Sequence, residues 1–376
     1  MTNTAVASII KDIQKKYGVE SASAATDMPP MNVVHSGSLA LDFALGCGGM
    51  PTNRVVEFLG EEGSGKTTAA LLVATQIIKQ QPERAVVILD MEHKLTPSWV
   101  EKLMGDAINN LVVLNPDTIE QASDMMRDTV KSGKVSMVVL DSIGGAPTQQ
   151  VMDDDRSAEQ SESMGGNAKG VTKFARWAAN FSAKYDCLVV GINQQRDDTK
   201  SRHGNMIVTP GGRGWKHACI LRIQFRKGPE KYFAKINGEE IRVGFNVIAR
   251  TIKNQAGGEE GRTAEWRFFN TESEEYGPVG IDTVEECIRL ATKVGVIVRA
   301  GAYYRHPALP DGQLQGMGKL VPAIREDDAL RATIVSETMA ALTGEDVDAS
   351  AISPIVEVDG ETDFNTDDMV SSIVTD

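Results

Sequence analysis

Residues Gly60 to Thr67 have the spacing of a phosphate-binding loop, with glycines at the first and sixth positions followed by a lysine and a threonine. An apolar run, Val55–Leu59, precedes them and a helical pattern, Thr67–Gln80, follows. Glycines let backbone N–H groups turn toward phosphates, while the lysine reaches the β and γ oxygens and the threonine hydroxyl holds Mg²⁺. This pattern predicts a nucleotide-phosphate site formed by Gly60, Glu61, Glu62, Gly63, Ser64, Gly65, Lys66, Thr67 and Thr68.

Three polar side chains follow other apolar runs that are typical of parallel strands, whose carboxyl ends share one edge of a sheet. Asp141 ends the run 135–141 and is predicted to bind Mg²⁺ with Thr67, the alternative being a turn cap. Glu92 follows the run 85–90 and is predicted to orient the attacking water, the alternative being a solvated loop acid. Gln194 directly follows the run 187–193, where an amide can sense the γ-phosphate. Trp99 either stacks on a base or fills core.

The elements that must position these residues alternate between short strands and helices from Met31 onward, which indicates an α/β fold with a mostly parallel central sheet. Predicted strands are 55–59, 85–90, 111–114, 135–141 and 187–193, and predicted helices are 67–80, 118–131 and 166–184. The later strands 218–225, 232–236 and 245–253 have no helices between them, and Asn237-Gly238 is a hairpin signal. The sheet is therefore expected to end in an antiparallel extension.

These patterns predict that the chain is divided into four segments. Residues 1–33 form an arm with an amphipathic helix over Ala5–Tyr17, and residues 34–274 form the ATPase core. Residues 275–344 form a small α/β C-terminal domain with helices over 283–293 and about 327–342. Residues 345–376 form an acidic tail that is expected to be disordered, since ten Asp or Glu occur there without a Lys or Arg.

Net charge, apolar runs and cysteine positions limit the classes of function that this chain can have. Removing the ten tail acids changes the formal net charge from −13 to −3, so the body can still carry a basic surface. No apolar run reaches membrane-spanning length and no signal core is present, which predicts a cytoplasmic protein. The four cysteines are scattered, and we expect buried reduced thiols rather than disulfides or zinc ligands.

Two long polar loops, 144–165 and 195–214, lie at the predicted nucleotide edge. The second contains Arg196, Lys200, Arg202 and Arg213, and such a basic loop suits a nucleic-acid backbone.

The chain resembles the bacterial RecA family of ATP-dependent DNA strand-exchange proteins, from the N-terminal helix to the acidic tail. The resemblance is carried by several dispersed segments in the same order: Ser36-Gly37-Ser38-Leu39-Ala40-Leu41-Asp42, Gly65-Lys66-Thr67-Thr68, Asp90-Met91-Glu92-His93, Asn115-Pro116-Asp117-Thr118, Asp141-Ser142, Ser163-Met164-Gly165, Asn193-Gln194 and Gly211-Gly212.

This resemblance implies a RecA-like P-loop ATPase that uses ATP and Mg²⁺ and forms helical filaments on single-stranded DNA, which it pairs with a homologous duplex. It implies that Glu92 activates water, that Trp99 stacks on adenine, that Gln194 links the γ-phosphate to the DNA loops and that Lys253 reaches ATP from a neighbouring subunit. It also implies a DNA-contacting set: Met164, Gly165, Lys169, Arg176, Arg196, Lys200, Arg202, Gly211, Gly212 and Arg213.

The sequence departs from the family pattern at Gln255, where a second lysine is usual, and at His217, where an aromatic is usual. These departures favour a divergent member, such as one encoded by a bacterial virus and acting in the host cytoplasm. Two alternatives stay open: a hexameric helicase or accessory ATPase of the same superfamily, and a structural filament protein switched by nucleotide.

Overall fold

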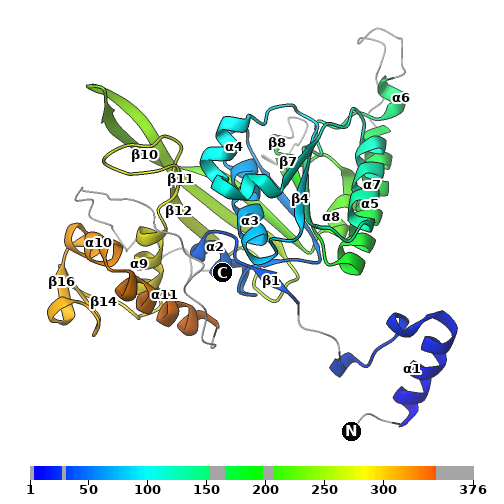
Figure 1. Cartoon of the computed structure of the whole chain (residues 1–376), viewed down its shortest axis with the longest axis horizontal. Coiled ribbons are helices and arrows are strands. Elements are labelled where there is room, and N and C mark those ends of the chain that lie inside the picture. The colour runs from blue at the N-terminus through cyan, green and yellow to red at the C-terminus, as the bar shows by residue number, and fades with distance from the viewer. Residues whose placement is uncertain (1–3, 28–30, 153–165, 198–206, 344–376) are drawn as a thin grey trace. The chain divides into compact units, whose positions relative to one another are not determined.

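The computed structural model covers the whole chain and describes residues 4–27, 31–152, 166–197 and 207–343 (Figure 1). The chain divides into two compact units, Met1–Asn32 and Val33–Asp376.

The first unit is built on helix α1 (Thr4–Tyr17), followed by the short 3-10 helices η1 (Val19–Ser21) and η2 (Ala25–Asp27). The predicted helix over Ala5–Tyr17 is confirmed. Val6, Ile9, Ile13 and Tyr17 are spaced three or four residues apart and each is more than a third exposed. The helix therefore presents an apolar stripe.

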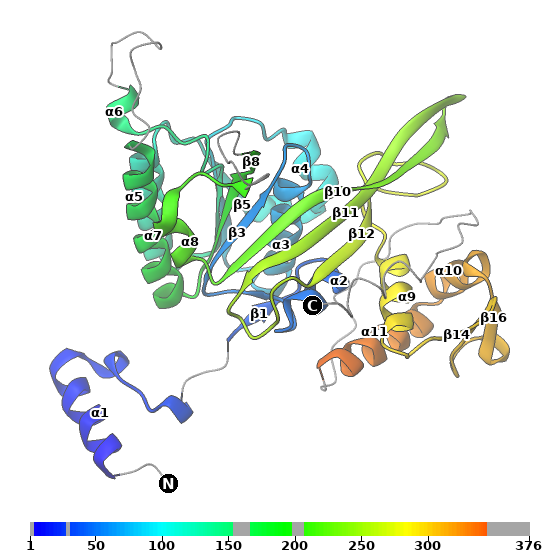
Figure 2. The same ribbon diagram turned by 180° about the vertical axis from the view of Figure 1, so that it is seen from behind.

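A mixed sheet lies at the centre of the second unit (Figure 2). Its strand order is β13-β12-β11-β10-β3-β7-β6-β4-β5. The pairs from β10 to β5 are parallel, and those from β10 to β13 are antiparallel. The strands are β3 (Val55–Gly60), β4 (Ala85–Asp90), β5 (Leu111–Leu114), β6 (Val135–Asp141), β7 (Leu188–Gln194), β10 (Leu221–Ile236), β11 (Glu239–Asn254), β12 (Thr263–Phe269) and β13 (Gly280–Ile281). The predicted parallel sheet with an antiparallel extension is confirmed.

The extension is longer than predicted, since β12 and β13 were not predicted and β11 begins at Glu239 rather than at residue 245. Where the sequence predicted two strands, 218–225 and 232–236, a single strand β10 runs over Leu221–Ile236. The pairing register with β11 shifts between Lys227 and Lys231, but the strand does not end there. Ala218, predicted to begin a strand, instead ends helix α8 (Gly212–Ala218). The predicted hairpin turn is confirmed, since Asn237 and Gly238 have φ values of 53° and 85°.

Helices cover both faces of the sheet (Figures 1 and 2). One core cluster packs β residues against α2 (Leu39–Leu45), α3 (Lys66–Gln80) and α4 (Pro97–Met104). A second packs the opposite face against α5 (Ile119–Lys131), α7 (Gly166–Tyr185) and α8. The short strands β1 (Val33–Val34) and β2 (Met50–Pro51) form a separate two-stranded sheet whose Val34 and Met50 belong to the first core cluster. A short helix, α6 (Gln149–Met152), lies between β6 and α7 in the chain. Across the described ranges, no helix combines the length and the apolar character needed to cross a membrane.

The C-terminal region has a core cluster of its own, formed mainly by three helices. These are α9 (Thr283–Lys293), α10 (Met317–Glu326) and α11 (Asp328–Thr343), with the small sheet β14 (Val298–Ala300), β15 (Tyr303–Arg305) and β16 (Gln313–Gln315). Asp282 caps α9, since its side chain accepts a hydrogen bond from the Glu285 N–H. The two predicted helices are confirmed, and the small sheet agrees with the predicted α/β character of this region, although its strand positions and helix α10 were not predicted.

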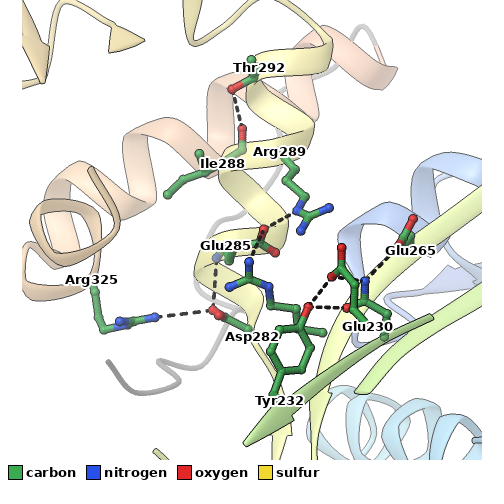
Figure 3. Close-up of polar contacts among 11 residues, drawn as sticks. Glu230, Tyr232, Glu265, Asp282, Glu285, Ile288, Arg289, Thr292 and Arg325 are labelled. Atoms are coloured by element: carbon green, nitrogen blue, oxygen red, sulfur yellow. Dashed lines mark hydrogen bonds and ion pairs between the residues drawn. The ribbon is translucent and has the colours of Figure 1, made fainter. Parts of the chain in front are cut away.

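Polar side chains join α9 to the antiparallel end of the large sheet (Figure 3). Arg267 Nη2 of β12 lies 3.7 Å from Glu285 Oε1 of α9. Beside this contact the Tyr232 hydroxyl of β10 lies 2.6 Å from Glu230 Oε2, and Arg325 Nη2 of α10 lies 3.5 Å from Oδ1 of Asp282, the residue that caps α9. Glu285 pairs with Arg289 on the same helix. Burial raises the pKa of Asp282 to about 6. The four cysteines are free; Cys187, Cys219 and Cys287 are buried as expected, whereas Cys47 is only partly buried.

Candidate functional site

The predicted phosphate loop lies between the end of β3 and the start of α3, as its sequence requires. A Cβ atom at Gly60 would lie 2.2 Å from the Phe225 carbonyl oxygen, so no larger residue fits there. Gly65 is the N-cap of α3 with φ 97°, a backbone conformation that favours glycine. The loop thus reaches the positive end of the α3 dipole, where an anion is stabilised.

Two buried polar groups in this loop suit a phosphate. Lys66 is only 6% exposed, and its Nζ donates to the carbonyls of Gly60 (3.0 Å) and Glu61 (2.6 Å). Burial lowers the pKa of Lys66, although Asp141 and Glu92 partly offset this. The Ser64 hydroxyl is buried and finds no hydrogen-bond partner among the described residues. A buried ammonium group and an unsatisfied hydroxyl donor in one loop fit an anionic ligand.

Thr67 and Asp141 meet at the carboxyl edge of the sheet, since the Thr67 hydroxyl donates to Asp141 Oδ2 over 2.8 Å. Burial raises the pKa of Asp141 to about 6, although the Thr67 hydrogen bond opposes this. A hydroxyl beside a carboxylate supplies the hard oxygen ligands that Mg²⁺ prefers. The predicted metal pair is therefore assembled with suitable donors.

Glu92 is held by donors from several elements. Its Oε1 accepts hydrogen bonds from the Ser142 hydroxyl and from Gln194 Nε2 (3.1 Å), and its Oε2 pairs with Lys94 Nζ at 2.8 Å. Burial alone would raise the pKa of Glu92, but the hydrogen bonds from Lys94, Ser142 and Gln194 outweigh it and hold the pKa below its usual range. The structure therefore places Glu92 and Gln194 in direct contact.

Two residues of this site were missed by the sequence reasoning. Asp90 is buried at the end of β4, where its Oδ1 accepts from the Glu92 N–H (3.1 Å) and so shapes the turn that carries Glu92. Ser142 is fully buried and contacts Glu92 directly. Each lies next to a strand end, and that position was the available signal.

Trp99 and Lys253, which were predicted to contact the nucleotide, pack against Phe268 and against the end of α8, respectively. The Trp99 ring on α4 packs edge-on against Phe268, with 6.3 Å between centroids. Lys253 Nζ donates to the carbonyls of Lys216 (3.0 Å) and Cys219 (2.6 Å) at the end of α8. Their predicted roles, stacking on adenine and reaching ATP in a neighbouring subunit, stay predictions.

Helices α7 and α8, with the N-cap of α8, carry most of the described part of the predicted DNA-contacting set. Lys169 and Arg176 line a shallow groove of about 530 Å³ along α7 with Lys173 and Trp177. Trp177 is flanked by two cations, Lys173 Nζ at 4.8 Å and the Arg127 guanidinium at 5.2 Å from the ring centroid. The α7 sequence contains four Lys or Arg and no acid.

Helix α8 begins directly beside α7. Gly211, with φ 95°, is its N-cap, and a Cβ at Gly212 would lie 3.5 Å from Ala168 of α7. Arg213 is exposed in the first turn. The structure therefore brings the Gly211–Arg213 segment and the α7 cations to one face of the sheet.

The remaining predicted DNA contacts are less completely described. Arg196 lies in strand β8 (Arg196–Asp197), which pairs antiparallel with β9 (Ile207–Val208). Met164, Gly165, Lys200 and Arg202 lie outside the described residues.

The fold and the site together define a P-loop protein of the α/β class, with a phosphate loop after one strand and carboxylates after two neighbouring strands. A family model described as the RecA N-terminal domain matches residues 4–265. That match covers well over half of the sequence. The chain belongs to the RecA family.

Individual relatives agree over most of their length. Protein RecA of Thermus thermophilus is 32% identical over 354 residues, which cover 91% of this chain and 97% of the relative. Protein RecA of Chlorobaculum tepidum is 32% identical, with 89% and 92% covered. A crystal structure of the RadB recombinase aligns with 62% of this chain and 96% of its own at TM-score 0.47 and 18% identity.

Proposed function

We propose that this protein is an ATP-dependent DNA recombinase that forms helical filaments on single-stranded DNA and pairs that DNA with a homologous duplex. Membership of the RecA family supports the proposal, since relatives match almost end to end. Neither a ring helicase or accessory ATPase nor a purely structural filament is favoured by these relatives. We further propose that the protein acts in the cytoplasm.

The nucleotide site supports ATP and Mg²⁺ as cofactors. Gly60 to Thr68 would hold the phosphates, with Lys66 supplying positive charge, while Thr67 and Asp141 would hold the metal ion, which neutralises phosphate charge when bound. Glu92 is poised to orient and polarise a water molecule, because its pKa is held low and it stays ionised at neutral pH. Hydrolysis of ATP to ADP and phosphate is the expected reaction.

The partners follow from the surfaces of both units. The basic face of α7 with the start of α8 suits a phosphate backbone, and aromatic Trp177 lies among its cations. The exposed apolar stripe of α1 suits docking on a second copy, as filament growth requires. In such a filament Lys253 would lie beside the nucleotide of a neighbour.

The contact between Gln194 and Glu92 is the strongest single observation in support of a DNA-dependent ATPase. Gln194 hydrogen-bonds the water-orienting Glu92 over 3.1 Å, and it also ends the strand that leads directly into the second loop. A change in that loop can therefore reach the carboxylate through one side chain. This contact predicts ATP hydrolysis that responds to DNA.

The test compares ATP hydrolysis with and without single-stranded DNA, and measures DNA affinity as salt is raised. We expect stimulation by DNA. Replacing Lys169 and Arg176 by Gln should reduce the salt slope by about 1.4, at roughly 0.7 per phosphate contact on a single strand. The matched control replaces Lys79 and Lys102, exposed on α3 and α4 across the sheet. An unstimulated wild-type ATPase would count against a DNA-dependent enzyme.

A further inference from the structure

A carboxylate lies buried in the middle of the sheet, where a strand normally carries apolar side chains. Glu57 of β3 is 0% exposed. Its oxygens pair with the Arg222 guanidinium from β10 on one side and accept from Asn193 Nδ2 (2.7 Å) from β7 on the other. Three adjacent strands are thus joined by polar side chains inside the fold.

Strand register explains why these three side chains meet. Glu57 lies beside Arg222 in the parallel pair with β10 and beside Gly191 in the parallel pair with β7. Asn193 is two residues after Gly191, so its side chain lies on the same face. Gly191 itself must be small, because a Cβ there would lie 2.2 Å from the Trp215 ring of α8.

The same side chains hold the end of the second loop. Asn193 Nδ2 also donates to the Pro210 carbonyl (2.9 Å), and Arg222 Nη2 contacts the Thr209 hydroxyl at 3.3 Å. Thr209 is only 5% exposed. The C-terminal end of the second loop is therefore held by Asn193 and Arg222, the two side chains that also contact Glu57.

The amide of Asn193 has a single orientation that satisfies these partners. Glu57 and the Pro210 carbonyl can only accept, so both must face the Asn193 NH₂ group. Asn193 Oδ1 is then buried without a partner among the described residues. Buried polar groups are seldom left unsatisfied for packing alone, and they often mark a functional arrangement. The next residue, Gln194, contacts Glu92.

We propose that Glu57, Arg222 and Asn193 form a polar bridge that couples DNA at the second loop to ATP hydrolysis, by fixing Thr209 and Pro210 against the strand that carries Gln194. The bridge members are positioning residues that act through Gln194. This inference rests on the proposed DNA-dependent ATPase. The same contacts connect nucleotide binding with DNA binding, and for these two binding equilibria the coupling is reciprocal, so the nucleotide state also changes DNA affinity.

The experiment replaces both charges together, Glu57→Leu with Arg222→Met, because removing one partner would leave the other charge buried and unpaired. We expect the DNA-free turnover rate and the KM for ATP to stay near wild type. Stimulation by single-stranded DNA should fall by roughly 5- to 150-fold, the usual range of coupling between sites. The ratio of DNA affinities with a slowly hydrolysed ATP analogue and with ADP should move toward one.

The matched control is Glu285→Leu with Arg289→Met, a second Glu–Arg pair, on α9, in which the carboxylate is buried and the guanidinium is 24% exposed. Because Glu285 also pairs with Arg267 at 3.7 Å, thermal unfolding first checks that this control folds. It should leave stimulation unchanged. If the Glu57 variant does not fold, as judged by thermal unfolding, Thr209→Val decides by removing only a hydroxyl that Arg222 contacts. The double variant decides if it folds, and Thr209→Val decides if it does not. If DNA stimulates the deciding variant as strongly as the wild type, the proposed bridge is wrong but the proposed function stands. A wild type that DNA does not stimulate would overturn the proposed function as well.

Discussion

At the scale of single residues, the carboxylate of Glu92 is oriented by its neighbours rather than by its own loop alone. Ser142 follows β6, Gln194 ends β7, and Asp90 at the end of β4 holds the Glu92 N–H. A group fixed from three strand ends loses little freedom when it engages water, which is the condition for effective general-base catalysis.

We expect Glu92→Gln to slow ATP hydrolysis by roughly 100-fold or more while nucleotide binding is retained, because the amide keeps the shape but cannot take a proton. Lys66→Ala should abolish hydrolysis by removing the buried charge that faces the phosphates. Steady-state ATPase assays and nucleotide titrations measure both effects. Glu101→Gln, an exposed acid on α4, serves as the control. Equal rates for wild type and Glu92→Gln would refute the assigned role.

At the scale of elements, apolar runs located the parallel strands well, because strands buried on both faces are apolar throughout. The same rule missed α8, since its short Gly-rich sequence, Gly212–Ala218, has too few turns to show a period. Ser142 was missed because its hydrogen bond to Glu92 joins two strand ends and depends on strand order, which the sequence does not state. Asp90 was missed because its bond to the Glu92 N–H is a turn contact that has no spacing signal of its own. The phosphate loop was found because its backbone geometry demands glycines at fixed spacing.

A buried acid predicts how helix α9 responds to pH. Glu286 accepts from the Ser38 hydroxyl and from the N–H groups of Leu39 (3.1 Å) and Ala40 (3.2 Å), at the start of α2. Burial raises the pKa of Glu286 from 4.5 to about 8. Between these values the unfolded chain has lost the proton and the folded chain keeps it. The free energy of unfolding should therefore fall as pH rises, by about 1.4 kcal/mol per pH unit from this group.

Thermal and urea unfolding from about pH 6.5 to about pH 8 measure this slope. This range begins above the pKa of about 6 for Asp282, so that the titration of Asp282 contributes little to the slope. Glu286→Gln cannot ionise and should remove most of the slope. Glu326→Gln, an exposed acid at the end of α10, should keep it. A Glu286 variant with the wild-type slope would show that this carboxyl group does not titrate in that range.

At the scale of the whole molecule, charge is distributed very unevenly along the chain. The net charge is −13, yet ten acids without a base lie between Glu345 and Asp376. Helix α7 shows the opposite bias, with four bases and no acid. A negatively charged protein can therefore still offer a basic face to DNA, and we expect its own acidic C-terminal segment to act as a tethered polyanion that competes for that face.

Truncation after Thr343 should accordingly strengthen DNA binding, above all to duplex DNA, because it removes the competitor without removing any described element. Affinity should be measured at low salt, since at physiological salt a Debye length of about 8 Å screens much of the effect. A full-length variant with the ten acids replaced by Asn or Gln separates charge from length, and it should bind as tightly as the truncated chain. If truncated and full-length chains bind duplex DNA equally at low salt, the segment serves solubility alone.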